Sequence, residues 1–221
     1  MAGIGAFNPK CGDHRPMTDE LETLLEMLAL KDERRTGWVL RGIEAPESVA
    51  AHTWGTATLC LLYADRADAA VDRDRAVSMA LVHDIAEART GDVATRAKRD
   101  DQRISADEKA ARERDALDDL FEPFREQELL ALWEEYEERE TATATFVKDM
   151  DLIDNCLQAL KYEREDRYDE TEPNDAFSEF ENLDEFFATA TPRIRTSIGE
   201  ELFEAIKARY EAEIGRDCKL P

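Results

Sequence analysis

Apolar residues recur along most of this chain at intervals of three and four, the spacing that places them on one face of an α-helix. Several of these segments follow a residue suited to cap a helix, namely Thr18, Asp72 or Asp74, and Thr141 or Thr143. The segments predicted to be helical are 18–31, 46–65, 73–87, 106–120, 124–140, 144–165 and 192–214. Because runs of β-branched and aromatic residues are hard to find, we predict an all-α fold.

Segments that break this periodicity suggest how the chain is organised. Residues 1–16 are rich in Gly and Pro and predict a flexible tail, which leaves 17–221 as a single domain with its core in 18–165. Residues 76–82 are apolar on almost every face and predict a buried helix. Residues 88–105 predict an active-site loop, and 163–184 an acidic surface excursion.

The strongly acidic charge balance argues against some classes of binding partner. The chain has 52 acidic and 29 basic residues, a net charge of −23, so we expect it to bind neither a nucleic-acid polymer nor an anionic membrane. Only 8 of the basic residues are Lys, while 43% of all residues are hydrophobic, a composition that resembles proteins adapted to a high-salt cytoplasm. We therefore expect a halophilic origin.

The four cysteines indicate a reducing compartment. They show no close pairing, and Cys60 and Cys156 fall in apolar helical stretches, where a thiol packs as a small hydrophobe. Cys11 and His14 lack a second pair of ligands, so we predict no zinc site there. Without an apolar span or a signal core, we expect a cytoplasmic protein.

The scarce histidines carry the candidate chemistry. Two of the three, His52 and His83, fall in predicted helices among apolar neighbours, and Asp84 adjoins the second. Asp151 lies at the edge of the buried face of its helix, where an unpaired carboxylate is costly and a cation would offset that cost. Asp149 points about 200° away from Asp151 on the same helix, so we interpret it as a solvated charge.

The spacing of these residues resembles the HD superfamily of metal-dependent phosphohydrolases, and specifically its 5′-deoxynucleotidase branch. The matching motifs are RTGWV at 35–39, PESVAAH at 46–52, ALVHDIAE at 80–87, GDV at 91–93 and FVKDMD at 146–151. The resemblance implies a helical HD-domain bundle that cleaves phosphate from deoxynucleoside 5′-monophosphates, and it favours a homodimer.

The resemblance also assigns roles to individual residues. The implied metal ligands are His52, His83, Asp84 and Asp151, a mixed nitrogen and oxygen set that suits Mn²⁺, Co²⁺, Fe²⁺, Ni²⁺ or Zn²⁺ better than Mg²⁺. The implied catalytic groups are Glu87 and Asp92, which could also hold a second, weakly bound cation. The implied substrate-binding residues are Arg35, Trp38 and Arg41. Ala51 departs from the family, whose members often have an acidic residue there, so we expect one outer contact to the metal site to be missing.

Two other functions remain open at this level. Another HD phosphohydrolase chemistry, a phosphodiesterase or a triphosphohydrolase, would use the same metal ligands. A non-catalytic metal-binding or nucleotide-binding module would keep the fold, although such modules usually lose a ligand and all four are present here.

The composition generates a first testable prediction. If the surface is adapted to high salt, the free energy of unfolding should rise from low salt to molar KCl, because the screening length falls from about 10 Å at 0.1 M to about 3 Å at 1 M. Denaturant unfolding at both salt concentrations measures this change. A stability that is unchanged or lower in molar salt contradicts a halophilic origin.

Overall fold

The computed structural model describes residues 17–67, 70–98, 101–171, 174–177 and 179–221. The predicted tail, with Cys11 and His14, lies outside these residues. Across the described ranges the regular structure is helical, apart from one isolated antiparallel bridge between Arg34 and Ser48, so the all-α prediction is confirmed.

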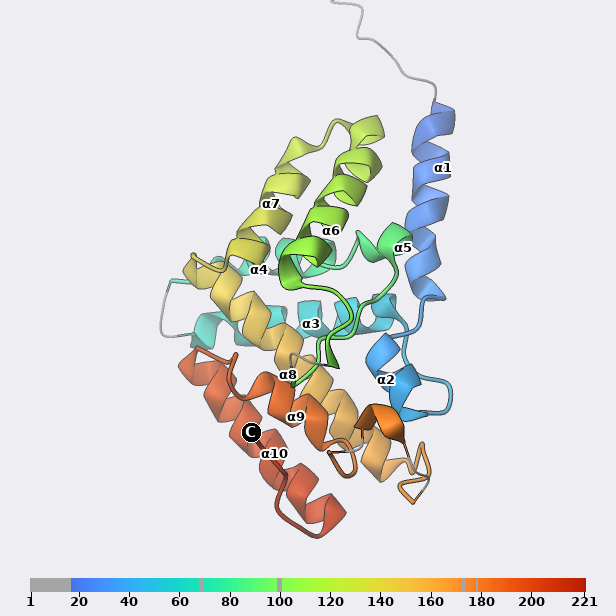
Figure 1. Cartoon of the computed structure of the whole chain (residues 1–221). Coiled ribbons are helices and arrows are strands. Elements are labelled where there is room, and N and C mark those ends of the chain that lie inside the picture. Colours follow the sequence, from blue (N-terminus) through green and yellow to red (C-terminus); the bar gives the residue numbers. More distant parts are fainter. Residues whose placement is uncertain (1–16, 68–69, 99–100, 172–173, 178) are drawn as a thin grey trace, which may run out of the picture.

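Helices follow one another along the whole described chain (Figure 1). The α-helices are α1 (Met17–Met27), α2 (Thr36–Arg41), α3 (Val49–Tyr63), α4 (Arg73–Val82), α5 (Glu87–Thr90), α6 (Ala106–Phe121), α7 (Gln127–Glu138), α8 (Ala142–Arg164), α9 (Asp184–Ala190) and α10 (Ser197–Ile214). Short 3-10 turns are η1 (Leu28–Lys31), η2 (Ala64–Arg66), η4 (Glu122–Phe124) and η5 (Asp175–Phe177).

Two helix starts follow the predicted capping residues, whereas Thr18 lies inside α1, which begins at Met17. Asp72 accepts a hydrogen bond from Arg75 N, and Thr141 accepts one from Ala144 N, which decides between the alternative caps of α4 and α8. Helix α4 ends at Val82, earlier than the predicted 87, so the residues that follow it lie in a turn. Helices α2 and α9 were not predicted, because six or seven residues are too few to display a helical period.

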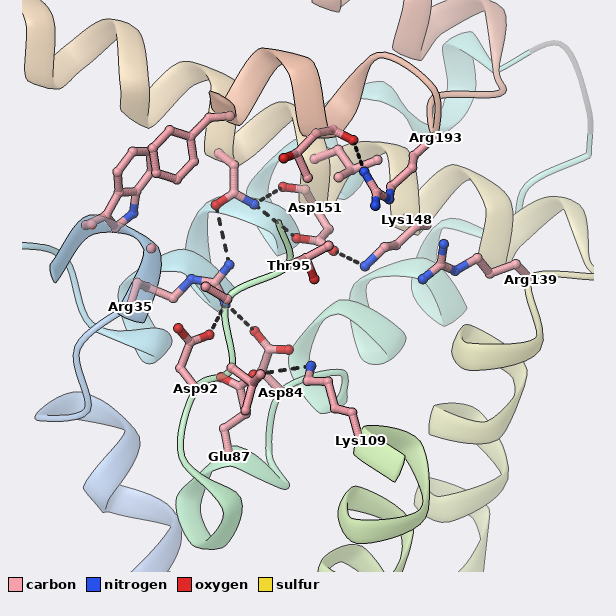
Figure 2. A pocket seen from close by; sticks show the side chains of 18 residues that line it. Arg35, Asp84, Glu87, Asp92, Thr95, Lys109, Arg139, Lys148, Asp151 and Arg193 are labelled. Atoms are coloured by element: carbon pink, nitrogen blue, oxygen red, sulfur yellow. Dashed lines mark hydrogen bonds and ion pairs between the residues drawn. The ribbon is translucent and has the colours of Figure 1, made fainter. Parts of the chain in front are cut away.

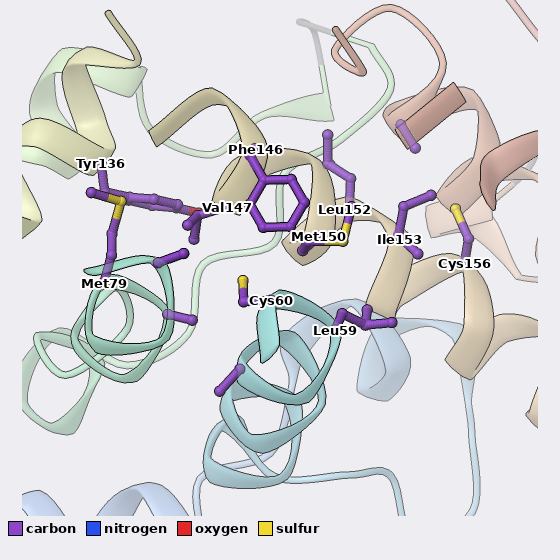
Figure 3. Close-up of a cluster of buried hydrophobic side chains, with 14 of the residues drawn as sticks. Leu59, Cys60, Met79, Tyr136, Phe146, Val147, Met150, Leu152, Ile153 and Cys156 are labelled. Atoms are coloured by element: carbon purple, nitrogen blue, oxygen red, sulfur yellow. The ribbon is translucent and has the colours of Figure 1, made fainter. Parts of the chain in front are cut away.

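Helix α8 is central to the core. It contacts α3, α4, α7, α9 and α10, and Figure 1 shows it crossing the molecule between the α3–α4 pair and the α9–α10 pair. Its apolar side chains pack against α3 and α4 (Figure 3). Cys60 and Cys156 are free and buried in this core, which confirms their prediction as packing residues. None of the described helices is both long enough and apolar enough to cross a membrane.

Two sequence-based expectations need correction. The interpretation of Asp149 as a solvated charge is wrong: it is 1% exposed and accepts hydrogen bonds from Arg195 N, Thr196 N and Thr196 Oγ1. It therefore ties α8 to the start of α10. The acidic segment 163–184 is not only a surface excursion, because the side chains of Tyr168 and Phe177 are buried. Both outcomes depend on tertiary contacts that no local pattern displays.

Candidate metal centre and active site

Three parts of the core bring the four predicted ligands together. His52 comes from α3, His83 and Asp84 from the turn after α4, and Asp151 from α8. His52 Nε2 lies 3.1 Å from Asp151 Oδ1 and 3.8 Å from Asp84 Oδ2, while His83 Nε2 lies 3.2 Å from Asp84 Oδ2. All four residues are buried. Residues separated by up to 99 positions in the sequence thus form one compact cluster.

Both imidazoles present Nε2 to the centre of the cluster. His52 Nδ1 lies 2.7 Å from Asp154 Oδ2, and His83 Nδ1 lies 2.7 Å from the Ala80 carbonyl oxygen. When each ring is neutral and donates its Nδ1 proton to these acceptors, the lone pair lies on Nε2, where it can coordinate a cation. Neither buried Nε2 has an assigned hydrogen-bond partner among the described residues, although Asp151 Oδ1 lies 3.1 Å from His52 Nε2.

These unpartnered nitrogens fit a divalent cation. One donor atom each from His52, His83 and Asp151 lies within 4.8 Å of the others, and Asp84 Oδ2 lies beside both rings. Two imidazole nitrogens with carboxylate oxygens form the donor set expected for a first-row transition metal. A cation there would also satisfy two buried nitrogen atoms that otherwise lack a partner.

The charges around the cluster shift the pKa values of its members. Burial and the Arg35 charge lower the pKa of His52, but its contacts with Asp151 and Asp154 outweigh them and raise it to about 10. Burial lowers the pKa of His83. Burial raises the pKa of Asp151, but Lys148 and His52 hold it well below its ordinary value. The carboxylate therefore stays ionised and able to coordinate a cation.

Asp154 is a residue that the sequence analysis missed. It lies one turn after Asp151 on α8 and fixes the His52 ring through Nδ1. Gly55 makes room for it, because a Cβ at that position would collide with the Asp154 carboxylate. Ala51 is exposed, so the outer contact expected to be missing at that position is supplied to His52 from α8 instead. The i, i+3 spacing of the two aspartates was the available signal.

Arg35 and Asp92 form one unit at the edge of the cluster (Figure 2). Arg35 Nη1 donates to Asp84 Oδ2 at 3.3 Å and to Asp92 Oδ1 at 3.1 Å, while its Nη2 donates to Asn155 Oδ1 at 3.4 Å. Asp92 also accepts a hydrogen bond from Thr36 N. Asp92 therefore holds the guanidinium of Arg35 beside Asp84, a predicted metal ligand, and the sequence did not reveal this contact.

Glu87 is 2% exposed and lines the same pocket. One of its carboxyl oxygens has no hydrogen-bond partner among the described residues, and the other lies 3.7 Å from Lys109 Nζ. Burial, together with the charges of Asp84 and Asp92, raises the pKa of Glu87 well above its ordinary value. The raised pKa favours the protonated carboxyl, the form that can give up a proton to a ligand in the pocket.

Trp38 and Arg41, the other two residues predicted to bind substrate, are placed differently from Arg35. Trp38 lines the pocket but is fully buried: its Nε1 donates to Glu47 Oε1, and its ring stacks on Phe186 with centroids 3.7 Å apart. It therefore has no open face for a base. Arg41 does not line the pocket; its guanidinium lies over the Tyr168 ring and donates to the Asn182 carbonyl oxygen.

An open pocket adjoins the cluster. Its lining includes Asp84, Asp151 and Glu87 together with five cationic side chains. These are Arg35, Lys109, Arg139, Lys148 and Arg193. Of the five, only Arg35 was predicted, since the others lie on helices and connections whose proximity is created by the fold.

The helical fold and the paired His and Asp residues define an HD-domain protein. The family model described as "HD domain" matches residues 27–195, and the chain belongs to this family. It is 40% identical over 137 residues to the 5′-deoxynucleotidase HDDC2 of Xenopus laevis, a match that covers 61% of this chain and 64% of that protein. The HDDC2 protein of Dictyostelium discoideum is 34% identical over 160 residues, which are 67% of this chain and 80% of that protein.

Solved structures show the same fold. The PH0347 protein of Pyrococcus horikoshii superposes with a TM-score of 0.64 at 28% identity, covering 86% of this chain and 98% of that one. A protein of Magnetospirillum magnetotacticum, described as a predicted metal-dependent phosphohydrolase, gives a TM-score of 0.60 at 26% identity, covering 93% of this chain and 98% of that one. The chain spans just under two thirds of the length of the animal relatives.

The contact between Asp154 and His52 generates a prediction. Replacing the carboxylate (Asp154→Ala) frees the His52 ring to turn, so we expect affinity for Mn²⁺ or Co²⁺ to fall about 10- to 100-fold. Calorimetric titration of metal-depleted protein measures this. Asp154→Asn, whose amide oxygen can still accept from Nδ1, serves as the matched variant and should lose less. Equal affinity of Asp154→Ala and the unaltered protein would show that Asp154 does not position the ligand.

Proposed function

We propose that this protein is a metal-dependent phosphomonoester hydrolase that releases phosphate from deoxynucleoside 5′-monophosphates. The observation that carries the proposal is the pair of buried imidazoles whose Nε2 atoms face Asp84 and Asp151, two carboxylates that line a pocket together with Arg35. The relatives named 5′-deoxynucleotidase support the choice of substrate.

His52, His83, Asp84 and Asp151 would hold the metal, which we propose to be Mn²⁺, Co²⁺, Fe²⁺, Ni²⁺ or Zn²⁺. Such a cation lowers the pKa of a water molecule and polarises a phosphoryl oxygen. The side chain that adjoins the ligand Asp84 is Arg35, held in place by Asp92. Its planar guanidinium suits the non-bridging oxygens of a phosphate.

Glu87 is the group that we assign to proton transfer. In the reaction, water attacks phosphorus, the bond from phosphorus to the 5′ oxygen breaks, and the leaving oxygen takes a proton. In its protonated form, which the raised pKa favours, the Glu87 carboxyl in the same pocket can donate that proton. The sequence suggested a second, weakly held cation near Glu87 and Asp92. Lys109, 3.7 Å from Glu87, already supplies positive charge at this point.

The nucleoside would lie against the apolar wall of the pocket. Phe186 lines the pocket and is partly exposed, and Trp38 stacks behind it. Trp38 therefore acts on the substrate through Phe186, whose ring it holds in one orientation.

Phosphate release from a panel of nucleotides, with each divalent metal added in turn, tests the proposed activity. We expect hydrolysis of deoxynucleoside 5′-monophosphates, and we expect Glu87→Gln to lower kcat roughly 100- to 10,000-fold with unchanged metal content. Asp74→Asn, an exposed carboxylate at the start of α4, is the control and should keep full activity.

Other outcomes would replace this proposal. Intact monophosphates with cleavage of cyclic nucleotides or triphosphates would indicate a phosphodiesterase or a triphosphohydrolase. Full activity in an Asp84→Ala variant would place the observed hydrolysis outside this site and favour a non-catalytic metal-binding or nucleotide-binding module.

We also propose that the protein forms a homodimer through an apolar groove. The groove has a volume of about 890 Å³ and lies between η1, α3 and α4, where Leu28, Leu61, Leu81 and the 71% exposed Trp54 reach the surface. Lys31 is the one charged residue in its described lining. In a chain of net charge −23, two copies repel each other least where they meet at such a face.

The size of the particle in solution tests the dimer. Light scattering after gel filtration should give twice the chain mass of 25.2 kDa for the unaltered protein. Trp54→Glu should give the monomer mass, because a buried unpaired carboxylate is costly. Val39→Glu, exposed on α2 and outside the groove, should remain dimeric. A monomeric unaltered protein, or a dimer that persists in Trp54→Glu, rules out this interface.

A further inference from the structure

The five cations that line the pocket fall into two groups. Arg35 is paired with Asp84 and Asp92, Lys109 lies 2.9 Å from Glu113, and Lys148 lies 2.6 Å from Asp151. Arg139 and Arg193 form no ion pair with any carboxylate in the described ranges. The first group is neutralised by the protein itself, and the second group is not.

Arg139 and Arg193 line the same pocket. Arg139 follows the last turn of α7, and its buried Nε has no hydrogen-bond partner within the described structure. Arg193 follows α9, and its guanidinium donates to the Thr189 carbonyl oxygen. Burial, followed by the charge of Arg139, lowers the pKa of Arg193, as expected for two cations near each other without a counter-charge.

This arrangement is costly unless an anion offsets it. The chain has 52 acidic residues against 29 basic ones, and each of the other three cations in the pocket has a carboxylate partner. Two partly buried guanidinium groups that line one pocket without such a partner destabilise the free protein. Their five-donor planar groups match the oxygens of a phosphate, which carries close to two negative charges at neutral pH.

The position of the pair distinguishes it from the site of hydrolysis. In Figure 2, Arg139 and Arg193 lie on the far side of Asp151 from Arg35, the side on which Lys148 pairs with Asp151. Arg35 adjoins the ligand Asp84 and serves the phosphate that is cleaved. The arginine pair is therefore placed for a different anionic group in the same pocket.

We propose that Arg139 and Arg193 form a second phosphate-binding subsite, so that the pocket accepts phosphomonoesters that carry a further phosphate group, such as nucleoside bisphosphates. The inference rests on the proposed function, because it takes the metal cluster as the place where one phosphate is hydrolysed. The second phosphate binds the arginine pair through charge-assisted hydrogen bonds and is not cleaved.

Binding of inorganic phosphate to the metal-loaded protein tests the subsite without any turnover. Calorimetry should give two phosphates per chain for the unaltered protein and one for the Arg139→Gln/Arg193→Gln double variant. Arg66→Gln, which removes an exposed arginine paired with Glu201 on another part of the surface, should keep two. Equal stoichiometry in the double variant and the unaltered protein overturns the subsite.

Comparison of two substrates tests the role of the arginine subsite in substrate recognition. For the unaltered protein, kcat/KM for deoxyadenosine 3′,5′-bisphosphate should exceed that for deoxyadenosine 5′-monophosphate, and the double variant should lower this ratio about 10- to 100-fold. A ratio that the double variant leaves unchanged overturns the proposal. If neither nucleotide is hydrolysed with any metal while the two-phosphate stoichiometry persists, the proposed function fails and the subsite stands.

Discussion

The packing of α8 against α3 and α4 is the contact on which the rest of the site depends. Helix α8 is the element that most of the core packs on, and this packing places Asp151 beside His52 and the turn after α4. Two imidazole nitrogens without partners then face two carboxylates in a buried space. Such a cluster is costly without a cation. The contacts that stabilise the fold therefore also create a site where a bound cation is favourable.

Around this centre, negative and positive side chains alternate. Asp84 and Asp151 face the metal position, and Arg35 and Lys148 pair with them from opposite sides. A cation that takes up the carboxylates would weaken these ion pairs and leave the basic groups available to phosphate oxygens. A strongly acidic protein can in this way attract an anionic substrate, because the local charge of the pocket differs from the net charge of the chain.

Hydrogen bonds from neighbouring side chains decide how rigidly the candidate ligands are held. Asp154 occupies the Nδ1 atom of His52, and Gly55 permits its approach. Asp149, two residues before Asp151, performs a different task, since its carboxylate accepts backbone hydrogen bonds at the start of α10. Asp149 and Asp151 point in different directions, as helix geometry requires. Asp149, however, points into another part of the core and not into solvent.

The sequence by itself determined the helical class and most helix positions, because helical periodicity and capping residues are local features. The scarcity of histidine and the family resemblance singled out four candidate metal ligands, which the fold brings close together. Only the tertiary structure decided what surrounds them. It buried Trp38 behind Phe186, turned Arg41 away from the pocket, and brought Lys109, Lys148 and the unpaired arginines to its wall. The physical reason is that burial and ion pairing depend on which helices pack together. The hydrophobic periodicity of a helix does not show which distant segment it will contact.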